Sequence, residues 1–249
     1  MIKLFSYPTS PYAQKVGCYL KYKQLDYQFV PVNPLSNEQI RFTQQRQVPV
    51  LMIDDEWRKD SSKLGVWLDE RYPQNPIVPS EASEREQILN IDQWISDELI
   101  PGNFRHAVEW QNTFNSITNG WRLARAVNDA TPLPLYVRAI WPYGVKRVKF
   151  IVNMVQQMDL SESIDDMTAR LTKEFIQHLD DGDFLGGRKE LSLADLSAFP
   201  IVMSGYLMGM RVKSFYIDTP EIREWAKRIQ AQLPTNPLLV PDRLLKRSL

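Results

Sequence analysis

The sequence predicts a small α/β domain followed by a larger, all-helical domain. Over residues 1–73, strand-like and helix-like segments alternate in the order β-α-β-α-β-β-α. Residues 72–80 then hold three prolines in nine positions, which cannot sustain a helix and is typical of a linker. From residue 81 onward the apolar residues recur mostly at helical spacing. We therefore expect domains at 1–73 and 81–249, joined by a proline-rich linker at 74–80.

The order of elements in the first domain follows from short apolar runs and from helix-breaking residues. The first helix begins at Pro11, since apolar residues recur at helical spacing from Ala13 to Leu20. Asn33-Pro34 opens a short helix that carries Ile40 and Phe42. The last helix begins at Asp60-Ser61 and ends at Tyr72-Pro73, because proline disfavours helical geometry in the residue before it. Strands are expected at 3–6, 27–32, 48–53 and 57–59.

The second domain is expected to be helical almost throughout. Apolar residues from Ile88 to Leu99 line one face of a long helix that ends at Pro101-Gly102. Ser192 followed by Asp195 is an acidic variant of the capping box, so another helix begins there. Residues 131–141 are rich in proline and aromatic residues and receive no assignment. Further helices are expected at 103–118, 145–158, 163–178 and after Thr219-Pro220.

Composition excludes several classes of function. Lys plus Arg and Asp plus Glu both number 30, so no overall charge attracts nucleic acid or an anionic membrane. Cys18 is the only cysteine, which excludes an internal disulfide and a cysteine-based metal cluster. His106 and His178 are far apart in sequence, so we expect no metal site. Because neither a signal peptide nor an apolar run of about 20 residues is visible, we expect a cytoplasmic protein without a membrane span.

The turn Tyr7-Pro8-Thr9-Ser10-Pro11-Tyr12-Ala13 joins the first strand to the first helix. Proline is tolerated in the first helical turn, so Ser10 is expected at the N-cap with Pro11 at N1. Unpaired N–H groups and the positive end of the helix dipole would stabilise an anion beside Ser10. Two interpretations are open at this stage, namely an ordinary serine cap and a site for chemistry on a negatively charged atom.

Two further motifs in the first domain have both a structural and a functional interpretation. The residue before a proline is extended, so the main chain of Val48, before Pro49, can pair with an extended ligand; the alternative is an edge-strand proline. At the next helix start, main-chain N–H groups and Ser61 suit a carboxylate, and Asp60 suits an ammonium group. A ligand with an α-amino acid end would satisfy both, whereas the alternative is simple capping.

Together these motifs resemble the glutathione transferase superfamily, whose first domain is thioredoxin-like and whose second is helical. The resemblance rests on Ser10-Pro11-Tyr12-Ala13, Val48-Pro49-Val50-Leu51, Asp60-Ser61 and, in the second domain, 184–187 followed by 192–196. The first half is most similar to the membrane-associated prostaglandin E synthase type 2 branch. That closer similarity is carried by Val32-Asn33-Pro34, Ile40-Arg41-Phe42 and Asp60-Ser61-Ser62.

The resemblance implies a glutathione site in the first domain, and by analogy a homodimer. Val48, before a cis Pro49, would pair with the cysteinyl main chain of glutathione. Asp60 and Ser61 would hold its γ-glutamyl end, and Gln47 its glycyl side. Ser10 would face the sulfur, with Tyr7 as the alternative hydrogen-bond donor.

One departure from the prostaglandin synthase branch defines the expected chemistry. That branch has Cys-Pro-aromatic-Cys where this chain has Ser10-Pro11-Tyr12-Ala13, so disulfide exchange at this site is excluded. What remains is a serine-type mechanism, in which Ser10 donates a hydrogen bond to the glutathione thiolate. The second substrate is expected to be a small apolar electrophile bound between the domains. Its expected lining is Tyr12, Phe104, Arg105 and Trp110.

Two functions are compatible with these features. The first is a glutathione transferase that adds the thiol to the electrophile. The second is a transferase-like binding protein without turnover, which is kept open by Gln44-Gln45-Arg46-Gln47, where many relatives have a glycine before Val-Pro.

Overall fold

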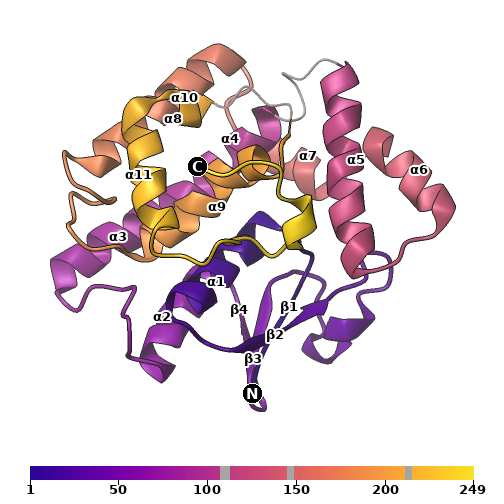
Figure 1. Ribbon diagram of the computed structural model, residues 1–249, viewed down its shortest axis with the longest axis horizontal. Coiled ribbons are helices and arrows are strands. Elements are labelled where there is room, and N and C mark those ends of the chain that lie inside the picture. Colours follow the sequence, from indigo (N-terminus) through magenta and orange to yellow (C-terminus); the bar gives the residue numbers. More distant parts are fainter. Residues whose placement is uncertain (107–112, 145–148, 211–214) are drawn as a thin grey trace.

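The computed structural model describes residues 1–106, 113–144, 149–210 and 215–249. Its first domain is built on a four-stranded sheet, which lies in the lower part of Figure 1 beneath the helical domain. The strands are β1 (Ile2–Ser6), β2 (Tyr27–Pro31), β3 (Val50–Ile53) and β4 (Glu56–Lys59). They are ordered β2-β1-β3-β4, with β1 and β2 parallel and the other pairs antiparallel. The four predicted strands are confirmed, although β3 begins two residues later than expected, after Pro49.

Helices α1 (Pro11–Tyr22) and α2 (Ser61–Arg71) cover one face of this sheet. Ile2 and Leu4 of β1 are buried against them, as the alternation of strand side chains requires. The opposite face is covered by the 3-10 helix η1 (Glu38–Thr43), which packs Ile40 against Phe5. This short helix begins at Glu38 and not at Asn33-Pro34. Ile40 is buried, whereas Phe42 remains 44% exposed.

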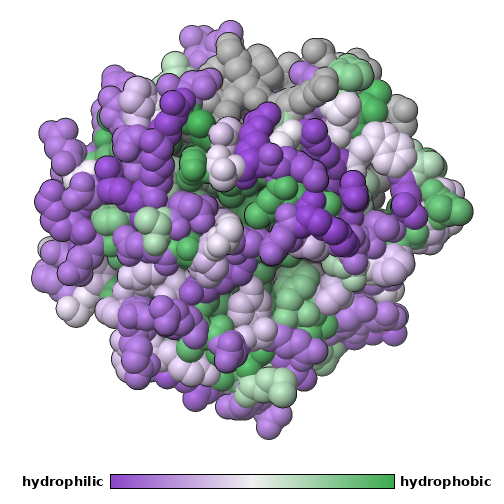
Figure 2. All heavy atoms as spheres, in the orientation of Figure 1, coloured by the Kyte–Doolittle hydropathy of each residue, from purple (hydrophilic) through white to green (hydrophobic). Residues whose placement is uncertain are grey.

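The second domain places one helix at its centre and the others around it (Figure 1). The central helix is α9, which is buried over nearly its whole length. Hydrophilic side chains cover most of the face of the molecule shown in Figure 2, with apolar groups scattered among them. The elements are α3 (Ala82–Trp94), η2 (Ile95–Leu99), α4 (Ile100–Arg105), α5 (Thr113–Ala130), α6 (Leu135–Gly144), α7 (Lys149–Gln156), α8 (Ile164–Leu179), α9 (Leu193–Leu207), α10 (Phe215–Asp218), α11 (Pro220–Gln230) and the 3-10 helix η5 (Asp242–Leu244).

The prediction that the long helix ends at Pro101-Gly102 is wrong. Helix α3 continues through η2, a single π-helical turn in which the N–H of Ile100 donates to the carbonyl of Ile95, and then into α4. Proline has no N–H to donate and its ring crowds the preceding turn of an α-helix. A π turn immediately before Pro101 widens the helix there, so the chain continues without a break.

The remaining predicted helices have mixed outcomes. The helices expected at 163–178 and after Thr219-Pro220 are confirmed as α8 and α11. The helix expected at 103–118 crosses residues outside the described range, and its second part, α5, continues to Ala130. The unassigned segment 131–141 contains most of α6. Within 145–158, the described helix is α7. Of the helices that the structure describes, none is both long and apolar enough to cross a bilayer.

The C-terminal segment returns to the first domain and lies along α1. The Lys21 ammonium donates to the carbonyl of Asn236 at 2.9 Å, and the N–H of Leu239 donates to Gln14 Oε1 at 2.9 Å. Cys18 is buried at this contact, where burial raises the pKa of its thiol to about 12. Helix α1 is therefore held between the sheet, the helical domain and this returning segment.

Candidate functional site

The register of the sheet brings the three predicted motifs to one edge of the first domain. Phe5 of β1 lies beside Val50 of β3, and Val50 lies beside Lys59 of β4. Because β3 runs antiparallel to both neighbours, the ends of β1 and β4 meet the start of β3. The turn to Ser10, the Val48-Pro49 segment and the start of α2 therefore leave the sheet from the same edge.

Ser10 is the N-cap of α1, as predicted, with Pro11 at N1. Its backbone is extended (φ −70°, ψ 121°), and its Oγ accepts a hydrogen bond of 3.4 Å from the N–H of Ala13. This bond is long for an N–H···O contact. It uses Oγ only as an acceptor, so the hydroxyl hydrogen of this half-buried residue can still be donated to a ligand.

Tyr7 lies at the end of β1, but its hydroxyl already has an acceptor. It donates to Asn37 Oδ1 at 2.8 Å, in the loop before η1. Burial raises the pKa of Tyr7, so the phenol is neutral at physiological pH. A tyrosine hydroxyl has a single hydrogen to donate, and here Asn37 accepts it.

The Val48–Pro49 peptide is cis, as the resemblance implies. Val48 is half-buried, and neither its N–H nor its carbonyl has a hydrogen-bond partner within the described part of the chain. Gln47 is exposed, and its main chain is bound by Gln45. Gln45 donates from Nε2 to the carbonyl of Gln47 at 2.9 Å and accepts from its N–H at 2.6 Å. The main chain of Val48 is thus available to an extended ligand.

Asp60 and Ser61 lie at the start of α2, in an unusual backbone conformation. Asp60 has φ 75° and ψ 106°, a region that residues other than glycine rarely adopt. Its side chain does not cap the helix but lies 3.6 Å from Lys63 Nζ, with about half of its surface exposed. Within the described residues no side chain therefore caps the N–H groups of the first turn of α2, and Ser61 is buried beside them. Such a helix start binds carboxylates readily.

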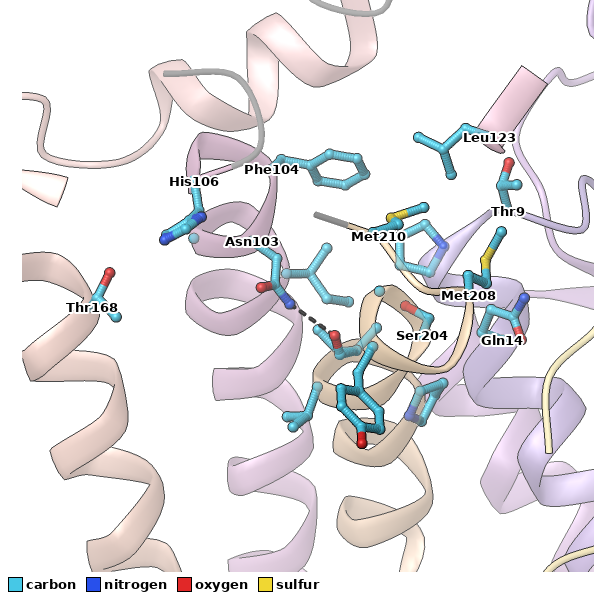
Figure 3. Close-up of a pocket in the computed structure, with 18 of the residues that line it drawn as sticks. Thr9, Gln14, Asn103, Phe104, His106, Leu123, Thr168, Ser204, Met208 and Met210 are labelled. Carbon is cyan, nitrogen blue, oxygen red and sulfur yellow. Dashed lines mark hydrogen bonds between the residues drawn. The ribbon is translucent and has the colours of Figure 1, made fainter. Parts of the chain in front are cut away.

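A cavity of about 190 Å³ lies next to this edge, between the two domains. Thr9 and Gln14 contribute from the first domain, and Asn103 and Phe104 contribute from α4 (Figure 3). Asn103 is fixed by a hydrogen bond of 3.0 Å from its Nδ2 to the carbonyl of Ile201 in α9. The rest of the lining is mainly apolar: Pro8, Pro11, Ile100, Gly102, His106, Leu123, Met167, Thr168, Pro200, Ile201, Val202, Ser204, Gly205, Tyr206, Met208 and Met210.

Known proteins are similar to this chain in the sequence of its first domain and in the order of its two domains. Residues 4–76 match the family described as glutathione S-transferase, N-terminal domain. The crystal structure of human glutathione transferase theta-2 shares the architecture across both domains, with a TM-score of 0.61. This is a glutathione transferase fold. The likeness to theta-2 covers 94% of this chain and 83% of that chain at 19% identity. The predicted fold class, a thioredoxin-like domain followed by a helical domain, is confirmed.

Two curated proteins are similar to this chain in sequence, and both are distant relatives. Prostaglandin E synthase 2 of Danio rerio is 21% identical over 276 residues, covering 92% of this chain and 70% of that protein. Glutathione S-transferase Z1 of Arabidopsis thaliana is 29% identical over 141 residues. That second match covers 48% of this chain and 62% of the plant protein, so it spans less than two thirds of its relative.

Of the residues predicted to line the second-substrate site, some line the cavity and others do not. Phe104 lines the cavity. The hydroxyl of Tyr12 lies 3.5 Å from the carbonyl of Ser96, and burial, with a contribution from Asp97, raises its pKa to about 12. Its ring packs edge-on against Phe150, outside the cavity lining. Trp110 lies outside the described residues.

The structure does not support Arg105 as a lining residue. Its side chain is buried inside the helical domain, where the guanidinium donates to the carbonyls of Asp159 at 2.9 Å and Glu162 at 2.6 Å. The spacing along α4 explains the difference. Residues 102–104 face the cavity, and the next residue turns toward the segment before α8.

Several cavity residues were not predicted from the sequence. Gln14 lies one helical turn after Ser10, a spacing that could have indicated it. Met208 and Met210 follow α9, and no local pattern shows that this helix ends beside the first domain. In the part of the chain that the structure describes, no group of three or more His, Cys, Asp or Glu residues is placed to hold a metal ion.

Proposed function

We propose that this protein binds glutathione, activates its thiol as the thiolate, and adds it to a small apolar electrophile held in the inter-domain cavity. One observation carries the proposal. The hydroxyl of Ser10, the unpaired main chain of Val48 and the uncapped start of α2 leave the sheet from one edge, beside the cavity.

The chemistry of glutathione matches these three positions. Its peptide main chain is extended and can pair with the N–H and carbonyl of Val48, as an added strand pairs with a sheet edge. The carboxylate of its γ-glutamyl end suits the N–H groups of α2 and the hydroxyl of Ser61. The ammonium group at the same carbon suits the exposed carboxylate of Asp60. With its peptide main chain and its γ-glutamyl end held in this way, glutathione would direct its sulfur toward the start of α1.

Thiol activation by Ser10 is energetically reasonable. Lowering a thiol pKa by two units takes about 2.7 kcal/mol, at 1.36 kcal/mol per unit. A hydrogen bond to a charged group contributes about 1.5–3 kcal/mol and a helix N-terminus about 0.3–1 kcal/mol. Ser10 and α1 together can therefore supply the shift. The thiol proton would pass to solvent, and the thiolate would form the new C–S bond with its electron pair. The electrophile's displaced pair leaves with the leaving group or moves to the adjacent atom, which then takes up a proton from solvent.

A binding protein without turnover is the second candidate, because the loop before Val48 is unusual. Gln44 has φ 56°, a left-handed conformation that glycine adopts without strain. Gln45 also binds the main chain of Gln47 and so closes the loop on the side where the glycyl end of glutathione would lie. This loop could hold glutathione in an orientation that does not lead to reaction.

The decisive experiment measures binding and chemistry separately for wild type and Ser10→Ala. Calorimetric titration gives the affinity for glutathione, and the ultraviolet absorbance of the thiolate reports the pKa of the bound thiol. Turnover is then measured with a panel of alkyl halides, epoxides and α,β-unsaturated carbonyls. We expect both proteins to bind glutathione and only wild type to ionise it near neutral pH. Binding with no turnover that depends on Ser10 would favour the second candidate, and absence of binding would refute both.

A further inference from the structure

Helix α1 has a second, polar face that glutathione activation does not use. Tyr12, Lys15 and Tyr19 recur at i, i+3 and i+7, so they form one stripe along the helix. This stripe faces the helical domain, since its side chains contact Ser96, Asp92 and Ser197 there. The Lys15 side chain has no exposed surface, which is rare for a lysine.

Lys15 is paired within a buried polar network that joins three helices. Its Nζ lies 2.8 Å from Asp92 Oδ1 in α3 and donates to Ser96 Oγ at 3.0 Å. The hydroxyl of Ser197, in α9, donates to the same oxygen of Asp92. Ser197 is in turn hydrogen-bonded to the hydroxyl of Tyr19. Burial raises the pKa of Tyr19 well above its ordinary value, so this hydroxyl stays neutral.

The network connects the two sides of the inter-domain cavity. Helix α1 carries Ser10 at its start and Gln14 in the cavity wall, next to Lys15. On the other side, Asp92 and Ser96 belong to the helix that continues through the π turn into α4, where Gly102, Asn103 and Phe104 form the opposite wall. Ser96 itself lies within that π turn.

Stability alone does not account for a network of this kind. A buried ion pair is often no more stabilising than apolar residues of similar volume, because both charges lose their hydration. Here the second carboxylate oxygen of Asp92 is buried and has no hydrogen-bond partner among the residues that the structure describes, which adds to that penalty. The pair instead provides contacts that depend on geometry. An ammonium between a carboxylate and a hydroxyl fixes the relative position of two helices more narrowly than apolar contacts do.

We propose that Lys15, Asp92 and Ser96 are positioning residues that set the separation of the two cavity walls, and so determine which electrophile reaches the thiolate. The proposal rests on the proposed function. We expect the network to affect how the electrophile fits in the cavity. We do not expect it to affect the binding of glutathione, whose predicted contacts lie at the sheet edge. None of the three residues is expected to contact either substrate.

The chain contains a matched control at the C-cap of the same helix. Lys23 is also fully buried, and its Nζ lies 2.6 Å from Asp69 Oδ1 in α2. It also donates to the carbonyls of Gln74 and Asn75 in the linker. This second pair has the same chemistry, but it holds the opposite end of α1 to the linker and does not connect the cavity walls.

The test compares the apolar replacement Lys15→Met/Asp92→Leu with Lys23→Met. We expect the double variant to fold cooperatively and to bind glutathione within about twofold of wild type. Its KM for the electrophile should rise about tenfold or more, since small displacements of a substrate-positioning wall have large kinetic effects. Lys23→Met should unfold at lower denaturant concentration and keep the wild-type KM. A stable double variant with unchanged KM and unchanged selectivity among electrophiles would overturn the proposal.

Two further measurements cover the cases in which the double variant does not fold or wild type shows no turnover. If the double variant does not fold, Ser96→Ala removes one of the two oxygen partners of Lys15, and we expect a smaller rise in KM of the same kind. A wild-type level of KM would contradict the proposal. If wild type shows no turnover, crystal structures of both proteins decide. A displaced α1 with an altered cavity supports the positioning role and refutes only the proposed function, whereas an unaltered cavity refutes the positioning role.

Discussion

Ser192 and Ser10 each cap the start of a helix, but their side chains differ in how many of their hydrogen-bonding groups are already used. Ser192, at the start of α9, is buried and fully engaged. Its N–H and its hydroxyl both donate to Asp195 Oδ2, at 2.9 and 2.8 Å. The other oxygen of Asp195 accepts from the N–H of Leu185 at 2.9 Å and from Trp225 Nε1 at 2.8 Å. The cap therefore satisfies itself and ties three segments of the helical domain together.

Ser10, at the start of α1, is half-buried and only partly engaged. The position three residues later, which is Asp195 in the other cap, is Ala13 here, and the first turn of α1 has no acidic residue. In the described part of the chain, one long contact to the N–H of Ala13 is the only hydrogen bond of its side chain. We call the pair Ser192 and Asp195 the closed cap, because the acid accepts the hydrogens of the serine and the cap stabilises the fold. We call Ser10 the open cap, because alanine at the third position leaves its hydroxyl hydrogen and the helix N-terminus for a ligand.

The largest effect is expected at the closed cap. Asp195→Ala removes the acceptor of four hydrogen bonds inside the helical core, leaving buried donors without a partner. We expect a loss of about 4 kcal/mol or more in the free energy of unfolding, which urea denaturation measures. Ser192→Ala, which keeps the carboxylate, should cost only about 1–2 kcal/mol. Similar losses for both variants would show that the acid does not organise this cap.

The closed cap was predicted from the sequence because its signal is local. Ser192 and Asp195 are three residues apart, and the pattern alone defines the contact. The same applies to the Ser10-Pro11 cap, whereas the cis peptide before Pro49 was implied only by the resemblance to a known family. The partners of Asp195 at Leu185 and Trp225 depend instead on how separate helices pack, and no local pattern specifies them.

The open cap should respond in activity and hardly in stability. Ser10→Ala removes the hydrogen-bond donor to the thiolate while its long cap contact contributes little to the fold. We expect kcat/KM to fall about 100-fold or more, as when one donor to a developing anion is lost. The free energy of unfolding should change by about 1 kcal/mol or less. Steady-state kinetics and denaturation of the same preparation measure both quantities.

Ser10→Thr is the matched control for the open cap. Threonine keeps the hydroxyl and is also a good N-cap residue, so it should retain a larger share of turnover than alanine. Equal losses for threonine and alanine would indicate a steric requirement at this position, in place of hydrogen-bond donation.

The site illustrates where sequence-based prediction ends. The positions of Ser10, Val48 and Asp60 follow from strand ends and helix starts, which the apolar pattern indicates. Arg105 was predicted to line the cavity together with Phe104, but one residue along a helix turns the side chain by about 100°. The contribution of Met208 depends on where α9 ends relative to the first domain, which is a tertiary property.

A smaller effect is expected at Tyr7, the alternative donor to the thiolate. Tyr7→Phe removes the hydrogen bond to Asn37, which should cost about 0.5–1.5 kcal/mol in the free energy of unfolding. Because that hydroxyl hydrogen is already engaged, turnover should fall by less than about fivefold, near 1 kcal/mol in the barrier. Side-by-side kinetics with Ser10→Ala test this order. A loss in Tyr7→Phe that exceeds the loss in Ser10→Ala would transfer thiol activation to Tyr7.

The smallest effect is expected at a third kind of cap, which is charged and exposed. Glu81 caps α3, where its side chain accepts from the hydroxyl of Ser83 and from the N–H of Glu84 at 2.8 Å. These hydrogen bonds lower the pKa of Glu81 to about 2, from an ordinary value of 4.5. Between these two pH values the unfolded chain binds a proton at Glu81 that the folded chain does not. The contribution of Glu81 is therefore complete above pH 4.5 and is lost as the pH falls toward 2.

Glu81→Gln makes that contribution measurable, because glutamine does not titrate. The difference in melting temperature between wild type and Glu81→Gln should be small near neutral pH and should shrink on acidification between pH 4.5 and about 2. Glu86→Gln makes the same change in charge on the same helix, away from its cap, and corrects for the change in overall charge. If both variants show the same pH profile, Glu81 acts only through its charge. A profile specific to Glu81 would show that an exposed cap stabilises its helix through directed hydrogen bonds, as the buried cap at Ser192 does with far larger effect.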